Sequence, residues 1–203
     1  MHIISLAPLT PATHADALQQ VYRATPQYWA MYNLPASPGG QARRDLEAAE
    51  TTAGRHMLGI VRHVPSTEIH AEAADADGAE AAPDTSTETA TDTKTETDAG
   101  PELELVGAVD LRLYWPGADQ AYIGMVMVAE PFQREGIGTQ AWTLLRPWLA
   151  ETAKVKTARL GVEQFNPTAL HFFQSLGFAL TGETNRIEVG SKWVRLLYME
   201  LAL

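Results

Sequence analysis

The sequence predicts one α/β (α+β) domain over residues 1–203, in which a mixed and mostly antiparallel central sheet is flanked by helices. Two early segments, near residues 13–22 and 41–50, place apolar residues at helical spacing. Residues 55–63 and 103–115 have strand character and are joined by a long polar stretch, which indicates an antiparallel hairpin. Beyond residue 121, a single strand–helix–strand unit precedes further strands. This order favours a mixed sheet over a doubly wound parallel one.

The first sixty residues are expected to contain a strand, two helices and a second strand. Residues 2–7 are apolar and alternating, as in a short strand. A helix begins between residues 10 and 13, because apolar residues follow at helical spacing. Residues 41–50 form the next helix, and residues 55–63 form the first strand of the hairpin.

Three aromatic residues, Tyr28, Trp29 and Tyr32, precede a stretch that is rich in proline and glycine. Aromatic side chains beside such a loop are candidates for lining a substrate pocket. Packing of the same rings on the sheet, as a hydrophobic cap, explains the pattern equally well. On the first interpretation all three are candidate substrate-binding residues.

The stretch 64–101 differs in composition from the rest of the chain. It contains ten acidic residues and one basic residue, Lys94, so −9 of the formal charge of −10 lies here. It has almost no large apolar side chains and cannot bury enough surface to offset the entropy lost on ordering. We therefore predict a disordered insertion in the hairpin, tolerated because loop closure costs little extra as length grows. An acidic segment that recruits a basic partner is the alternative.

The second half of the chain supplies the remaining strands and two more helices. Strict alternation through residues 105–113 puts the odd-numbered residues on one face of their strand. A buried strand at 121–128 leads through a glycine turn into a helix with Ala141, Leu144, Leu145, Trp148 and Leu149 on one face. The other expected elements are a strand at 157–162, a helix from Asn166-Pro167 to Gly177, and strands at 178–181, 187–189 and 193–201.

The glycine turn, residues 133–139, reads QREGIGT and has three interpretations. One is a tight connection without a ligand. Another is a dinucleotide site, because Gly136-x-Gly138-x-x-Ala141 fits a loose fingerprint and Glu163 follows a later strand. The last is a pyrophosphate loop, in which unpaired amides at the start of the helix bind an anion.

Two motifs in this order resemble the GNAT acyltransferases (Gcn5-related N-acetyltransferases). The loop Gln133-x-x-Gly136-x-Gly138 is similar to the family's Q/R-x-x-G-x-G/A loop, whose amides hold the coenzyme A pyrophosphate. Residues 166–178, NPTALHFFQSLGF, resemble the segment N-x-x-A-x-x-x-Y-x-x-x-G-F that follows it. The resemblance covers the chain from about Val106 to the C-terminus and implies the family's mixed sheet, with two central strands that splay apart.

The resemblance also implies how the chain would hold acetyl-coenzyme A as a co-substrate. The backbone at Met127 and Val128 would hydrogen-bond the pantetheine arm in the gap between the strands. The residues that the resemblance implies as contacts for the rest of the coenzyme are Gln133, Arg134, Gly136, Ile137, Gly138, Thr139, Asn166 and Phe173. For Asn166 a helix N-cap is the alternative role.

The family's reaction needs a base for the incoming ammonium and a proton donor for the leaving thiolate. Many members carry a Glu and a Tyr for these tasks, where this chain has Tyr122 and Phe173. A phenyl ring cannot donate a proton, and an unperturbed phenol has a pKa of about 10. We therefore take Glu163 and Tyr122 as the candidate catalytic residues. Asp110 and His171 are the other titratable candidates.

Composition disfavours several classes of protein. The chain has no cysteine, which excludes disulfides and a thiol nucleophile. No apolar run approaches the ~20 residues that span a bilayer, and the N-terminus lacks signal-peptide features, so a cytoplasmic location and no membrane partner are expected. The nearly neutral remainder has no stripe of Lys or Arg, which argues against nucleic acid. No metal site is expected.

The sequence thus predicts an acetyl-coenzyme A-dependent N-acetyltransferase that acts by direct transfer on a primary amine of a small molecule or a peptide. A non-catalytic acyl-coenzyme A-binding or sensing module is the alternative, since the usual acid is missing. A nucleotide-binding oxidoreductase is a third interpretation. The final strand is able to pair across a homodimer, as it does in some members of the family.

Overall fold

The computed structural model of the chain describes residues 3–64, 102–189 and 192–203. Within these ranges seven strands form one sheet in the order β1-β2-β3-β4-β5-β7-β6, and every neighbouring pair is antiparallel except β4 and β5. The strands are β1 (Ile3–Pro8), β2 (Arg55–Val64), β3 (Glu102–Leu113), β4 (Gln120–Val128), β5 (Thr157–Glu163), β6 (Ala179–Val189) and β7 (Lys192–Ala202). The mixed, mostly antiparallel sheet that the sequence predicts is confirmed.

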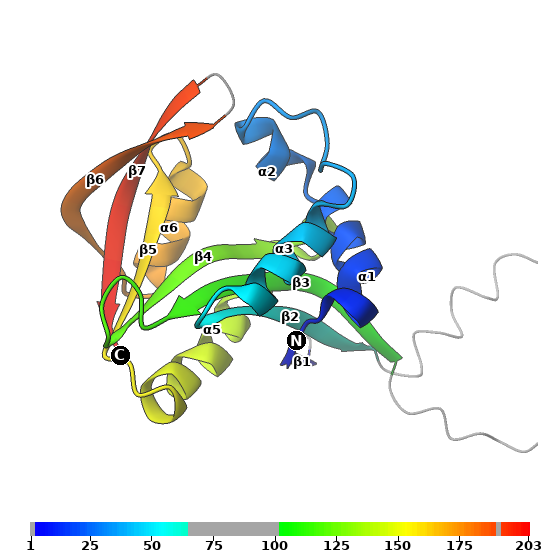
Figure 1. Cartoon of the computed structure of the whole chain (residues 1–203), viewed down its shortest axis with the longest axis horizontal. Helices are drawn as coiled ribbons and strands as arrows, with labels where there is room; N and C mark the ends of the chain where they lie inside the picture. Colours follow the sequence, from blue (N-terminus) through cyan, green and yellow to red (C-terminus); the bar gives the residue numbers. More distant parts are fainter. Residues whose placement is uncertain (1–2, 65–101, 190–191) are drawn as a thin grey trace, which may run out of the picture.

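Helices cover both faces of the sheet (Figure 1). The helices are α1 (Pro11–Arg23), α2 (Pro26–Met31), α3 (Gln41–Thr51), α5 (Ile137–Pro147) and α6 (Pro167–Ser175), with a 3-10 turn η1 (Glu130–Phe132) and a π-helical turn η2 (Trp148–Thr152). One hydrophobic core packs the sheet against α5, η2 and α6, and a second packs it against α1, α2 and α3. No helix in the described ranges is long and apolar enough to cross a bilayer.

The β2–β3 hairpin brackets the acidic stretch. β2 extends through Val64, one residue further than the sequence suggested, and pairs there with Glu102. Residues 65–101, which hold the rest of the predicted insertion, lie outside the described residues. The strict alternation expected for residues 105–113 is wrong, because Val106 is the extra residue of a β-bulge between Gly107 and Leu105. As a result Val106 and Val109 face the same core.

The helix after the glycine turn and the η2 turn bury three of the five residues expected on the buried face, namely Ala141, Leu145 and Leu149. The buried residues of the helix are Ile137, Ala141, Trp142 and Leu145, whereas Leu144 is 46% exposed. The helix gives way after Pro147 to the η2 turn, which buries Leu149. Near the C-terminus, the two short strands expected at 178–181 and 187–189 are parts of one strand, β6, which contains a register shift between Leu180 and Thr184.

Candidate active site

The parallel strands β4 and β5 pair over only part of their length. Their register runs from Gln120↔Thr157 to Ile123↔Leu160. Beyond this point β4 continues to Val128 and β5 to Glu163, but the two strands no longer pair with each other. Figure 1 shows the two strands diverging from this point. On the β3 side the register passes from Asp110↔Met125 to Leu111↔Ile123, so Gly124 is the extra residue of a β-bulge. The bulge lies where β4 leaves β5, and it opens a gap in the middle of the sheet.

The loop at the open end of β4 presents a helix N-terminus. After the η1 turn, Arg134 has φ +66° and Gly136 has φ +80°, and α5 begins at Ile137. Gln140 is the first residue of the helix whose amide reaches a helical carbonyl, that of Gly136, at 2.9 Å. The amides of residues 137–139 therefore have no acceptor within the helix and carry its partial positive charge. This is the arrangement that binds phosphate groups.

Gly136 shapes the approach to these amides. A Cβ added at Gly136 would have no atom within 4 Å, so this side of the loop is open. The side chains of Gln133, Arg134 and Thr139 are exposed around it, while Ile137 is 1% exposed and anchors the first turn in the core. Gln133 Nε2 donates to the Val128 carbonyl at 2.8 Å and closes the turn. The loop therefore fits a diphosphate held by main-chain amides.

The α6 side of the gap is lined by apolar side chains. Phe172 lies against Gly138, where a Cβ would come within 3.1 Å of its Cζ. Phe173 packs edge-on against Phe178, with ring centroids 5.6 Å apart. Between these rings and Val126 is a cavity of only about 10 Å³. Phe173 is thus part of an apolar wall on the α6 side of the gap.

Asn166 has the capping role that the sequence offered as its alternative. Its Oδ1 accepts from the Ala169 amide at 3.0 Å, and Pro167 occupies the first position of α6. An Asn at the N-cap followed by Pro is a strong helix start. The cap fixes α6 directly after the end of β5, beside the gap.

Tyr122 lies on the opposite face of the sheet from α5, at the base of the gap. A Cβ at Gly161 on β5 would come within 3.1 Å of the Tyr122 hydroxyl, so the glycine makes room for it. The Tyr122 ring packs edge-on against Trp115 at 4.9 Å. Burial, followed by the neighbouring Tyr198, raises the pKa of Tyr122. The phenol therefore remains protonated, so it can donate a proton but cannot act as a base.

Glu163 is joined to the N-terminal half of the chain by one hydrogen bond. The hydroxyl of Tyr32, which follows α2, donates to Glu163 Oε1. Tyr28 packs edge-on against Tyr32 with centroids 5.4 Å apart. Burial raises the pKa of Tyr28 to about 12, and the Glu163 charge adds to this. Burial also raises the pKa of Tyr32, so the phenol is a hydrogen-bond donor to the carboxylate. The structure thus brings together Tyr28, Tyr32 and Glu163.

The remaining candidates lie in other environments. Trp29 is 7% exposed, and its Nε1 donates to the Tyr22 carbonyl at 2.7 Å, so it belongs to the second core. Met127, 4% exposed, lies in the same core and leaves only its backbone for a ligand. Asp110 is held by Arg55 through contacts of 3.0 and 2.6 Å. His171 is exposed on α6.

Sequence reasoning missed two neighbours of Tyr122, namely Gly161 and Tyr198. An isolated glycine inside a strand often marks a close approach, and Gly161 carried that signal. Nothing local pointed to Tyr198. Among the described residues, no group of three or more His, Asp or Glu side chains is arranged to hold a metal ion.

Known proteins share this architecture. Residues 79–178 match the model of the acetyltransferase (GNAT) family. An acetyltransferase from Thermus thermophilus is 23% identical, with both chains covered in full and a TM-score of 0.64. A probable GNAT-family acetyltransferase from Chromobacterium violaceum is 16% identical over 98% of this chain and 82% of that one, with a TM-score of 0.67.

A third solved structure contains the coenzyme. The PaiA N-acetyltransferase from Thermoplasma acidophilum, in complex with coenzyme A, is 13% identical over 99% of each chain, with a TM-score of 0.57. No curated protein sequence matches the chain. At these identities the solved structures show only that the fold is shared, and the family is indicated by the match to residues 79–178. The chain therefore contains a GNAT-family acetyltransferase domain and is an acyltransferase.

Proposed function

We propose that this protein transfers an acetyl group from acetyl-coenzyme A directly to a primary amine of a small molecule or a peptide, using the whole chain as one domain. The observation that carries the proposal is the gap between β4 and β5, which is lined differently on its two faces. The open N-terminus of α5 lies at one end of it, and Tyr122 and Glu163 lie on the opposite face. The coenzyme and the acceptor would enter from opposite faces and meet in the gap.

The coenzyme-binding residues follow from the loop. The amides of Gly136, Ile137, Gly138 and Thr139 would hold the diphosphate, with Arg134 at the exposed rim. The Val128 carbonyl already accepts from Gln133, so the pantetheine would pair with other backbone groups of the β4 segment Met125–Val128. Acetyl-coenzyme A supplies the activated acetyl thioester. Alignment of the two reactants in the gap would account for much of the rate.

Two side chains divide the proton transfers. Glu163 would accept a proton from the acceptor's ammonium, because an ammonium has no free electron pair for attack. Tyr122 would donate its phenolic proton to the sulfur that leaves and would recover a proton from solvent. Tyr32 would orient the Glu163 carboxylate by its hydrogen bond. Tyr28 and Tyr32 would contact the acceptor.

The decisive experiment measures coenzyme binding and turnover separately. We expect calorimetry to detect acetyl-coenzyme A binding and no NAD binding, and thiol release to be stimulated by members of a panel of primary amines. Binding without acylation of any amine or peptide in a broad panel would favour an acyl-coenzyme A-binding module. Binding of NAD in place of the coenzyme would contradict the proposed co-substrate.

Tyr122→Phe is expected to lower kcat for thiol release about fivefold while leaving coenzyme affinity unchanged. The effect is moderate because a thiol has a pKa of about 8.5 and its thiolate leaves with little assistance. Tyr198→Phe is the matched control. It also removes a phenol hydroxyl, but it keeps the Tyr198 ring, whose centroid lies 4.4 Å from the guanidinium carbon of Arg159. An unchanged kcat in Tyr122→Phe would show that water protonates the thiolate.

A further inference from the structure

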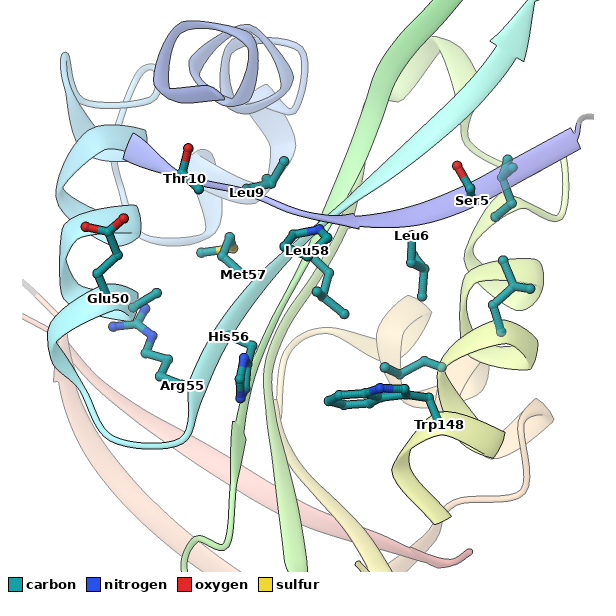
Figure 2. Close-up of a pocket in the computed structure, with 15 residues that line it drawn as sticks. Ser5, Leu6, Leu9, Thr10, Glu50, Arg55, His56, Met57, Leu58 and Trp148 are labelled. Carbon is teal, nitrogen blue, oxygen red and sulfur yellow. The ribbon is translucent and has the colours of Figure 1, made fainter. Parts of the chain in front are cut away.

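A second cavity, of about 610 Å³, lies at the β1–β2 edge of the sheet. It is bounded by β1, the start of β2, the end of α3 and the C-terminal part of α5 with the adjoining η2 turn (Figure 2). The β1–β2 register ends at Pro8↔Leu58, the Leu9 amide donates to the Met57 carbonyl at 2.9 Å, and residues 55 and 56 of β2 extend past this point beside the cavity. Its volume is within the range of small-molecule sites. None of the residues proposed for acetyl transfer lines it.

Most of the wall is apolar and includes two rings. Leu6, Met57, Leu58 and Leu145 contribute aliphatic surface. Trp148 extends from η2 toward His56, and their ring centroids are 6.2 Å apart at 79° (Figure 2). Leu144 also lines the cavity and is 46% exposed. A ligand with an apolar, ring-bearing body would bury this surface.

The charges on the wall do not cancel. Arg55 lines the cavity, but Asp110 neutralises it through a bidentate ion pair. Glu50, at the end of α3, lines the same cavity, and the described part of the chain gives it no ion-pair partner. Figure 2 shows Glu50 and Arg55 on the side away from Trp148. Glu50, an exposed residue on the wall of a mostly apolar cavity, is therefore the charge there for which the described residues provide no ion-pair partner.

We propose that this cavity binds an organic cation, namely an ammonium group joined by a short alkyl chain to an apolar ring. The ring would lie against Trp148 and the leucines, and the ammonium would pair with Glu50. The ring of the ligand adds to such binding because aromatic rings pack favourably edge-on or offset against one another. The site is separate from the acceptor site of the acetyl transfer, so it can be occupied while the coenzyme is bound.

Calorimetry on the full chain saturated with coenzyme A tests this proposal. The probes are phenylalkylamines with two to four methylenes, together with the alcohols and carboxylates of the same lengths. We expect one of the amines to bind about fivefold more tightly than its alcohol, as for a partly exposed ion pair, and the carboxylate to bind most weakly. Glu50→Gln should remove the difference between amine and alcohol. Glu47→Gln, at an exposed position one turn earlier on α3, should retain it.

Two further variants separate this site from others. Leu144→Gln, at an exposed position that tolerates a polar residue, should weaken amine and alcohol alike. Glu163→Gln should leave amine binding unchanged. Failure of every probe to bind, equal affinities for amine and alcohol, or a preference that survives Glu50→Gln would each overturn the proposal. Loss of amine binding in Glu163→Gln would overturn it too, by assigning the amine to the acceptor site. Coenzyme binding, measured in the same instrument, reports on the proposed function independently.

Discussion

Glu163→Gln is expected to lower kcat/KM for acetyl transfer by about a hundredfold, because the variant has no base for the acceptor's ammonium. Glutamine keeps an oxygen that can accept from the Tyr32 hydroxyl, so the geometry of the contact is retained. Thiol release at saturating acetyl-coenzyme A measures the loss. Calorimetry should show unchanged coenzyme affinity.

The pH dependence distinguishes a lost base from a structural defect. As the pH rises toward the pKa of the amine, the acceptor arrives as the free base and needs no deprotonation by the enzyme. The defect of Glu163→Gln should therefore shrink between about pH 8 and pH 10, near the ordinary pKa of an alkylamine. Glu188→Gln, on the exposed part of β6, should behave as the unmodified enzyme does. A defect that is constant over this range would contradict a role for Glu163 as base.

Gly136→Ala is expected to raise the Kd for coenzyme A about thirtyfold. Gly136 has φ +80°, where a Cβ costs roughly 1–2 kcal/mol, so the turn would shift to relieve the strain. The shift would move the amides at the start of α5, and each hydrogen bond to a charged group contributes about 1.5–3 kcal/mol. The loss of one such bond corresponds to roughly ten- to hundredfold in affinity. Calorimetry with coenzyme A measures the change.

Gly182 provides a matched control. It has φ +84°, and a Cβ there also has no atom within 4 Å, so Gly182→Ala carries the same backbone strain at a site on β6. Both variants should lose similar thermal stability, and only Gly136→Ala should lose coenzyme affinity. Equal coenzyme affinity in the two variants would contradict a diphosphate site at this loop.

The glycine loop could be predicted from the sequence because its geometry is local. Positive φ at Gly136 and the unpaired amides of residues 137–139 are properties of a few consecutive backbone units. The same holds for Asn166, whose capping bond to Ala169 spans three residues. Such features depend on no distant partner, so a motif can specify them.

The face of the sheet on which each side chain lies was harder to predict. The bulges at Val106 and Gly124 each shift one strand by a residue, which transfers later side chains to the other face. Apolar and small residues occur on both faces here, because helices cover both, so the pattern contained no sign of the slip. On the helices, Trp29, for which a pocket and a packing role were both open, is in a core, and Leu144, which was expected to be buried, is exposed.

The sequence by itself determined the mixed sheet, most of the order of its elements and the glycine turn that precedes a helix, since these follow from hydrophobic periodicity and from backbone chemistry within short segments. Only the tertiary structure decided that Tyr32 meets Glu163, that Gly161 makes room for Tyr122, and that Arg55 rather than solvent holds Asp110. These contacts join residues up to 131 positions apart. Their geometry depends on where strands bulge and diverge, and that is fixed by packing of the whole sheet between its two helical layers.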